Sequence, residues 1–289
     1  MTIRFTMFQS LSLLMMAMIG MVCCSPNKGR PDTGASPGDT VAVAVMHLTD
    51  TSSFVKANGE QCLICAEGNI TYPNSYGDTA ATARLQRLFA NVVLDAGDSL
   101  SLDEAAHFYI ANSIHQYDFA GVPRTTADGH DDETESQDTV FKYNTTTNVQ
   151  VFYHSPKLIT FNKVEVVKKN DHVTSLIHRY YTFDLAELRY VDLLRLFRED
   201  ALPEVSQLLR AKLMELHHVT TNEQLNDLGY FNVENLTVTR NFYFDDNGVT
   251  WSFLPNELAV EAVGEPKITI SYGDLSESLC ENSIIERLK

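Results

Sequence analysis

The stretch from Leu236 to Leu275 constrains the fold most, because it holds three consecutive segments in which apolar and polar residues alternate. In a β-strand, alternate side chains point to opposite faces, so each segment offers one apolar face and one polar face. The apolar positions are, segment by segment, Leu236, Val238, Phe242 and Phe244, then Val249, Trp251 and Phe253, then Ile268, Ile270 and Tyr272. Between the first two segments, Asp245-Asp246-Asn247-Gly248 predicts a short hairpin loop in which Gly248 is free to adopt positive φ. The stretch therefore predicts a three-stranded sheet whose apolar face must be covered by other parts of the chain.

Amphipathic segments elsewhere can supply that cover. Apolar residues at helical spacing predict a helix over residues 80–94, and Ser101 with Glu104 forms the capping box of a second helix. Two further helices are predicted over residues 191–197 and 200–216, the latter capped by Asp200 with Pro203 in its first turn.

Residues 140–185 lie between these helical regions and alternate in the manner of a strand meander, with a turn at Lys169-Asn170-Asp171. The expected fold class is α+β, with mixed or antiparallel sheets and helices packed on one face. The two expected halves are residues 41–180 and residues 181–280.

The charge balance excludes one class of partner. The chain has 289 residues with 22 basic and 38 acidic side chains, which gives a net charge of −16. Such a chain is repelled by nucleic acid phosphates, and it shows no basic stripe. A cationic partner fits this charge, and so does a simple contribution to solubility.

Residues 1–23 have the make-up of a lipoprotein signal peptide. Arg4 is followed by an apolar run from Leu11 to Val22, which is short of the roughly 20 residues that a permanent membrane span needs. The run ends in the letters MVCC, which resemble a bacterial lipobox, and Cys24 is the predicted lipidation site because a small residue precedes it. The alternatives are an ordinary cleaved signal peptide and an uncleaved anchor.

Residues 24–40 are rich in Pro, Gly and Ser, which predicts a flexible tether. Ser25 follows the lipidated cysteine in place of an inner-membrane retention Asp, so the outer membrane of the bacterial cell envelope is the expected location. The lipid chains together would give stable anchoring.

The cysteines of the mature chain favour structural chemistry over catalysis. Cys62 and Cys65 form a C-x-x-C motif, but zinc would need a second pair or suitably spaced histidines. A thioredoxin-like site would need a βαβ context, which the sequence does not indicate. In an oxidising periplasm we expect one disulfide, either Cys62–Cys65 or one of the two with Cys280.

The acidic run at residues 128–138 has few apolar side chains, so a solvated loop is expected. A calcium site is the alternative, although the spacing matches no EF-hand loop. The sequence contains no G-x-S-x-G, no H-E-x-x-H and no glycine-rich phosphate cradle, so no catalytic, cofactor-binding or metal-binding residue is predicted.

Two stretches carry a resemblance to a known family. RYYTFDLAELRYVDLLRLF, residues 179–197, and NFYFDDNGVTWSFLPNELAVEAVGEPKITISYGDL, residues 241–275, are similar to the extracellular module of RsiV-type anti-sigma factors and PdaC-like peptidoglycan deacetylases. Upstream, GNITYP and the segment from Val151 to Val167 resemble the smaller N-terminal half of that module. The matching positions in the second stretch are Glu257, Ala259, Gly264, Ile270, Tyr272 and Leu275.

The resemblance implies a two-part α+β module and a binding function. Its RsiV-type members bind lysozyme, a cationic protein, and their half-joining turn usually reads Gly-Gly-Ala-His. This chain has Lys168-Lys169-Asn170-Asp171-His172 there and keeps the histidine alone, so His172 is a candidate ligand contact. The chain shows neither a cytoplasmic sigma-binding segment nor a second hydrophobic span, and we expect no transmembrane anti-sigma factor.

The expected function is that of a non-enzymatic binding module, for a cationic protein such as lysozyme or for the cell-wall glycan of peptidoglycan. The first alternative is a glycan hydrolase that uses paired carboxylates. The second is a scaffold subunit of a surface complex.

Overall fold

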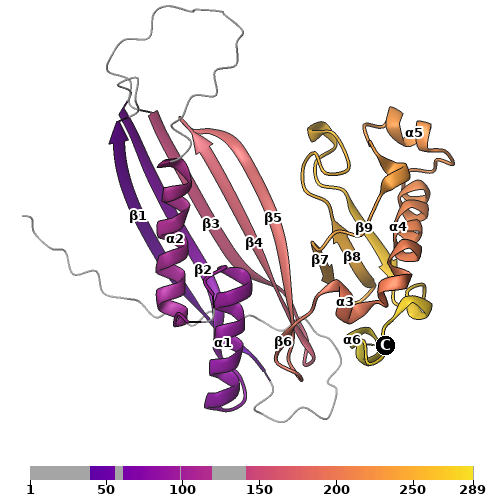
Figure 1. Ribbon diagram of the computed structural model, residues 1–289, viewed down its shortest axis with the longest axis horizontal. Helices are drawn as coiled ribbons and strands as arrows, with labels where there is room; N and C mark the ends of the chain where they lie inside the picture. Colours follow the sequence, from indigo (N-terminus) through magenta and orange to yellow (C-terminus); the bar gives the residue numbers. More distant parts are fainter. Residues whose placement is uncertain (1–39, 56–60, 98, 119–140, 289) are drawn as a thin grey trace, which may run out of the picture. The chain divides into compact units, whose positions relative to one another are not determined.

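The computed structural model describes residues 40–55, 61–97, 99–118 and 141–288 (Figure 1). Cys24, the tether and the acidic run at 128–138 lie outside these ranges. None of the described helices has the length and apolar character that a membrane crossing requires.

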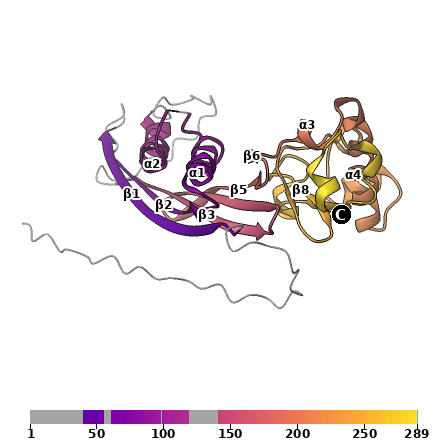
Figure 2. The same cartoon turned by 90° about the horizontal axis from the view of Figure 1, so that it is seen from below.

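A six-stranded sheet is formed by the first half of the chain, in which strands follow one another in sequence order. All neighbouring pairs are antiparallel except β2 and β3, which are parallel. The strands are β1 (Ala42–Val55), β2 (Gln61–Ser75), β3 (Phe141–His154), β4 (Leu158–Lys169), β5 (His172–Asp184) and β6 (Arg189–Tyr190). Parallel neighbours require a long crossover connection, and here it carries α1 (Thr79–Val93) and α2 (Leu102–Asp118). Both helices lie on the same face of the sheet (Figure 2).

The two crossover helices form where their sequences predict them. Asp78 caps α1 by accepting a hydrogen bond from the Ala81 amide, and Ser101 and Glu104 form the expected capping box of α2. The apolar stripe of α1 packs onto β4, where the rings of Phe89 and Phe161 meet edge to face at 4.9 Å. The prediction of helices packed on one face of a sheet is confirmed.

The hairpin between β4 and β5 turns at Asn170 and Asp171, as predicted. Both residues have positive φ, 46° and 68°, which Asn and Asp tolerate better than other side chains. Lys169 and His172 are the last cross-strand pair before the turn.

A separate three-stranded antiparallel sheet is built from the stretch singled out by its alternating pattern. It comprises β7 (Phe242–Phe244), β8 (Gly248–Ser252) and β9 (Lys267–Ser271). Phe242, Trp251 and Ile268 stand opposite one another on the three strands and are all buried. Helix α4 (Leu202–Leu216) covers this row with Val205, Leu209 and Leu213. The predicted roof over the apolar face is therefore confirmed.

Short helices complete this part of the chain. Those described are α3 (Leu193–Leu196), α5 (Asn222–Asp227) and α6 (Ile284–Leu288), with 3-10 turns at Glu199–Ala201, Val233–Asn235, Glu261–Val263 and Ser276–Ser278. The mixed α+β fold class is confirmed. Ser36–Lys289 form one compact unit, and the predicted division near residue 180 stays a prediction.

The second, more polar face of the small sheet is buried on β7 and β8, whereas Lys267 and Ser271 of β9 are exposed. Tyr243 packs against Tyr180 of β5 with ring centroids 4.5 Å apart, and the Thr250 hydroxyl shares a 2.8 Å hydrogen bond with Thr269. Tyr180 of the larger sheet thus covers part of this face, and the buried Thr250 hydroxyl is satisfied by Thr269.

One side chain joins the two sheets through hydrogen bonds. The Asn241 amide nitrogen donates to the carbonyl oxygens of His178 and Ser252, each at 3.0 Å. Its amide oxygen accepts from the Tyr180 backbone N–H, also at 3.0 Å. Strand β5 of the first sheet is thereby connected to β8 of the second.

Two local predictions are wrong. Helix α4 begins at Leu202 with Ala201 as its N-cap, while Asp200 lies in the preceding 3-10 turn. Capping by Asp200 would rely on the amide three residues later, and Pro203 has none. Gly248 does not have positive φ; instead, a Cβ there would lie 2.1 Å from the Ile270 carbonyl oxygen, so glycine is required by the close approach of β9.

Candidate functional site

The residues singled out from the sequence do not form a common site. Cys62 and Cys65 lie on β2, whereas His172 is exposed at the start of β5, and strands β3 and β4 lie between the two. The role of His172 as a ligand contact stays a prediction.

The structure does not contain the expected disulfide. Cys62, Cys65 and Cys280 are all free thiols in the structure. Cys62 and Cys65 lie three residues apart on one strand, which separates their Cα atoms by about 10 Å and points them to opposite faces. A disulfide requires Cα atoms within about 7 Å, so strand β2 excludes the Cys62–Cys65 bond. Cys280 instead donates to the Arg195 carbonyl oxygen at 3.0 Å.

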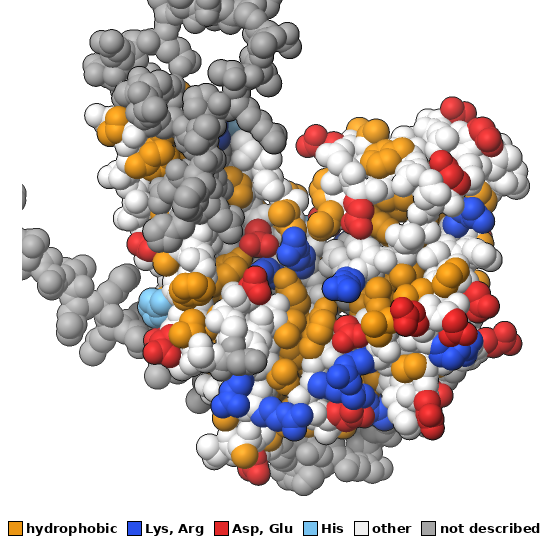
Figure 3. All heavy atoms as spheres, in the orientation of Figure 1, with side chains coloured by type: hydrophobic (Ala, Val, Ile, Leu, Met, Phe, Trp, Pro, Cys, Tyr) orange, Lys and Arg blue, Asp and Glu red, His pale blue; other side chains and the backbone are white. Residues whose placement is uncertain are grey.

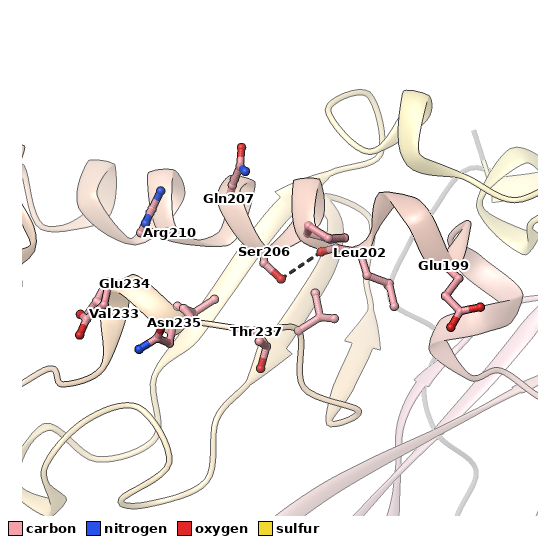
Figure 4. A pocket seen from close by; sticks show the side chains of 12 residues that line it. Glu199, Leu202, Ser206, Gln207, Arg210, Val233, Glu234, Asn235 and Thr237 are labelled. Atoms are coloured by element: carbon pink, nitrogen blue, oxygen red, sulfur yellow. Dashed lines mark hydrogen bonds between the residues drawn. The ribbon is translucent and has the colours of Figure 1, made fainter.

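The main candidate site is a groove of about 730 Å³ between α4 and the segment that follows α5. Figure 4 shows the segment from Val233 to Thr237 running along α4. The lining residues are Glu199, Leu202, Pro203, Ser206, Gln207, Arg210, Val233, Glu234, Asn235, Leu236, Thr237 and Val238. The groove has the size of a ligand site and combines an apolar lining with a few polar groups. We call it the α4 groove.

Charged side chains at the α4 groove are available to a ligand. Glu199, Glu234 and Arg210 form no salt bridge or side-chain hydrogen bond with the described residues of the chain. By contrast, the Ser206 hydroxyl donates to the Leu202 carbonyl oxygen of its own helix at 3.0 Å, the bond drawn in Figure 4. The unpaired charges in the groove are therefore those of two glutamates and one arginine.

Among the described residues, the excess of acidic side chains lies mainly in the C-terminal part, which holds this groove. Residues 191–288 contain 17 Asp and Glu against 7 Lys and Arg, a difference of 10 negative charges. The described residues from 40 to 190 contain 11 acidic and 9 basic side chains, a difference of 2. Figure 3 shows acidic side chains spread over the surface of the C-terminal part, with Lys and Arg between them. A charge count by segment would have revealed this asymmetry from the sequence.

A buried polar cluster lies under the helices of the larger sheet. The Lys163 ammonium, whose residue is 4% exposed, donates to the carbonyl oxygen of Val93 at the end of α1 at 2.9 Å. It lies 3.8 Å from the Glu165 carboxylate, which accepts a hydrogen bond from the Tyr109 hydroxyl of α2. A cation at a helix C-terminus is favourable, so this cluster connects strand β4 to both helices. Burial lowers the pKa of Lys163.

A smaller cavity of about 270 Å³ adjoins this cluster. Its lining includes the carboxyl groups of Asp95 and Glu165, together with Asn112 and Ser113 of α2. Sequence reasoning did not find this cavity, because Asp95, Asn112 and Glu165 come from three separate elements and share no motif.

Tyr181 lies beside this cluster, and its burial predicts that the protein loses stability at alkaline pH. Burial raises the pKa of Tyr181 to about 12, above the value of about 10 for a tyrosine in an unfolded chain. Its contribution to stability is therefore complete below pH ~10 and is lost as pH rises towards 12. Lys163 acts in the opposite sense, since its lowered pKa makes stability rise with pH up to its unfolded pKa of ~10.5. We expect the urea midpoint of unfolding to fall above pH ~10.5 and Tyr181→Phe to flatten that fall. An equally steep fall in the variant would contradict this assignment.

Comparison with known proteins places the α4 groove within a recognised sequence region. Residues 195–273 match the family model described as "Protein of unknown function (DUF3298)". Every residue that lines the α4 groove falls inside this range. No curated protein matches the chain significantly.

Two solved structures share the fold. A DUF3298 family member from Bacteroides fragilis NCTC 9343 is 20% identical with a TM-score of 0.64, and the match covers 86% of this chain and 98% of that one. A DUF3298 family protein from Pseudomonas aeruginosa PAO1 is 11% identical with a TM-score of 0.52, covering 85% and 97% respectively. At these identities the likeness concerns the fold alone.

Proposed function

We propose that the chain is a non-enzymatic binding module of the bacterial cell envelope and that its C-terminal part binds a cationic protein. The observation that carries the proposal is the excess of 10 negative charges in residues 191–288, the part of the chain that holds the α4 groove. Complementary charge accelerates the encounter of two proteins and selects the partner. The unpaired glutamates Glu199 and Glu234 would then face the basic side chains of the ligand.

The proposed location is the outer membrane, with the module held by lipid at Cys24 and by the tether of residues 24–40. The sequence around Cys24 and the serine that follows it support this location. A lipid-anchored module meets ligands that arrive from the surrounding medium or from the cell wall.

Lysozyme is the cationic ligand that we propose to test first. The support is the resemblance of residues 179–197 and 241–275 to the RsiV-type and PdaC-like module. The match of residues 195–273 to DUF3298 overlaps both stretches. Cell-wall glycan is the alternative ligand.

The test is titration of lysozyme onto the full chain, purified in detergent. We expect binding that weakens by about tenfold or more between ~0.05 M and ~0.5 M salt, because screening shortens the reach of surface charges. A protein of similar size with net negative charge serves as the control and should not bind. Soluble peptidoglycan fragments form a parallel arm. Lysozyme binding that is absent at low salt would remove the proposed ligand, and binding of the fragments instead would select the glycan.

A glycan hydrolase is the second candidate, because Asp95 and Glu165 line the 270 Å³ cavity together. Glycosidases use two carboxyl groups on either side of the bond to be cleaved. Release of reducing sugar ends from peptidoglycan by the full chain, abolished in Asp95→Asn, would establish this activity. No release would remove the candidate.

A further inference from the structure

The segment Thr237–Thr239 has no strand partner in the structure. Its alternating sequence predicts an extended segment that runs on to Phe244 with an interruption at Arg240, yet the second sheet starts only at Phe242. Leu236, which ends the preceding 3-10 turn, has φ −55° and ψ 125°. The difference between pattern and structure lies in the missing hydrogen-bonded neighbour, because a strand requires a ladder as well as alternation.

The backbone of this segment is free to pair. No backbone N–H or C=O of Thr237, Val238 or Thr239 is hydrogen-bonded to any other described residue. The Thr239 hydroxyl accepts from the Asn241 N–H, and this is a side-chain contact. Backbone N–H and C=O groups are normally paired with another protein group or with water. Because these groups have no protein partner, they form an open edge to which another strand can pair.

The segment is nevertheless held in place. Leu236 is buried in the core of the C-terminal part, and Val238 packs against the same core. Thr237, between these two residues, is exposed, and Thr239 is half-buried. Leu236 and Val238 thus anchor the backbone on both sides of Thr237 to the core.

The open edge lines the α4 groove. Thr237 and Val238 form part of one wall, with Ser206 and Arg210 of α4 among the residues of the groove (Figure 4). Glu199 and Glu234, both unpaired, belong to the same lining. The groove therefore combines backbone hydrogen-bonding groups and an apolar lining with two carboxylates and one guanidinium, that of Arg210.

We propose that the α4 groove binds an extended peptide segment of a cationic partner, which adds as a strand along Thr237–Thr239. Strand addition gives affinity through main-chain hydrogen bonds, and alternate side chains give specificity. The three residues span about 10 Å, enough for a short ladder. Lys or Arg side chains of the peptide are paired by Glu199 and Glu234. This inference rests on the proposed function and specifies how the cationic ligand is held.

The decisive variant is Thr237→Pro in the full chain. Proline removes the N–H of residue 237 and blocks the ladder, while no described hydrogen bond of the free protein is lost. The ψ of Leu236, 125°, lies in the range that a residue before proline prefers. Thr237→Ala is the matched control, because it shortens the same side chain and keeps the N–H. Thermal unfolding of both variants should match that of the wild type.

Two probes report on the edge, lysozyme and a seven-residue acetylated peptide of alternating Lys and Val. We expect Thr237→Pro to weaken both by about tenfold or more, the effect of losing one or two main-chain hydrogen bonds. Thr237→Ala should change binding by less than about threefold, a side-chain effect alone. N-methylation of alternate amides of the peptide should weaken its binding to the wild type as strongly as the proline does.

The outcomes separate this inference from the function on which it rests. If lysozyme binds the wild type and Thr237→Pro equally, strand addition is overturned and the charge-based function stands. If the Lys–Val peptide binds through the edge but lysozyme does not bind, lysozyme is removed as the ligand while strand addition stands. A peptide whose affinity is unchanged by N-methylation, or that does not bind, overturns the inference.

Discussion

Trp251→Ala is expected to lower the free energy of unfolding by about 3–5 kcal/mol, the cost typical of removing a large buried aromatic side chain. Trp251 is completely buried in β8, the central strand of the small sheet. Its ring lies 6.1 Å from Phe197 after α3 and 6.3 Å from Phe242 on β7. Alanine would leave a cavity between the sheet and its helical cover, which the surrounding backbone could not close.

Urea unfolding followed by far-ultraviolet circular dichroism measures this change without relying on tryptophan fluorescence. Leu216→Ala, at a position 58% exposed near the end of α4, is the control and should change stability by less than about 0.5 kcal/mol. Equal midpoints for Trp251→Ala and the wild type would contradict the description of this core.

Lys163→Met is expected to lower the free energy of unfolding by about 2–4 kcal/mol, the second large effect. Methionine fills a similar volume but leaves the Val93 carbonyl oxygen without its donor and Glu165 without its ammonium neighbour. Removing one partner from a fully buried ion pair costs ~3–5 kcal/mol. The expected loss is smaller because the Glu165 side chain is 26% exposed and water can solvate part of its charge.

A double-variant cycle identifies the origin of that loss. Adding Glu165→Gln to Lys163→Met removes the uncompensated charge, so the double variant should be more stable than the sum of the two single changes predicts. The measurement is again the free energy of unfolding in urea. Additive effects would show that the two side chains do not interact, and Lys163 would then act through the end of α1 alone.

Local sequence patterns predicted most elements of the fold. The capping box of Ser101 with Glu104 and the turn at Asn170 and Asp171 act through neighbours in the chain. Alternating runs around Trp251 predicted the small sheet and its buried row. These signals succeed because the interactions that they encode lie within a few residues.

Long-range contacts account for the errors. The polar face of β7 is buried because Tyr180, about 60 positions earlier in the chain, covers Tyr243. The parallel pairing of β2 with β3 joins residues such as Ile70 and Val149, and no local pattern specifies it. Gly248 is required by the Ile270 carbonyl of a different strand. In each case the deciding neighbour is remote in sequence.

The α4 groove also depends on such contacts. Its glutamates, Glu199 and Glu234, are separated by 34 intervening residues and belong to different turns, so no spacing rule relates them. The alternation through Leu236 and Val238 predicts an extended segment, interrupted at Arg240, but a sequence pattern does not reveal whether a strand partner is present. The candidate site therefore became visible only with the three-dimensional fold.

The Asn241 side chain has a consequence for the register of both sheets. Its carboxamide has the same donor and acceptor as a peptide group, and it occupies the position that a neighbouring strand would take beside β5. A slip of β5 by one residue would turn the His178 carbonyl and the Tyr180 amide away from it, because these groups alternate along the strand. Asp cannot donate to the two carbonyl oxygens, and Gln is one methylene longer. A single carboxamide thus couples the two registers, because its three hydrogen bonds form together only when β5 and β8 are both correctly aligned.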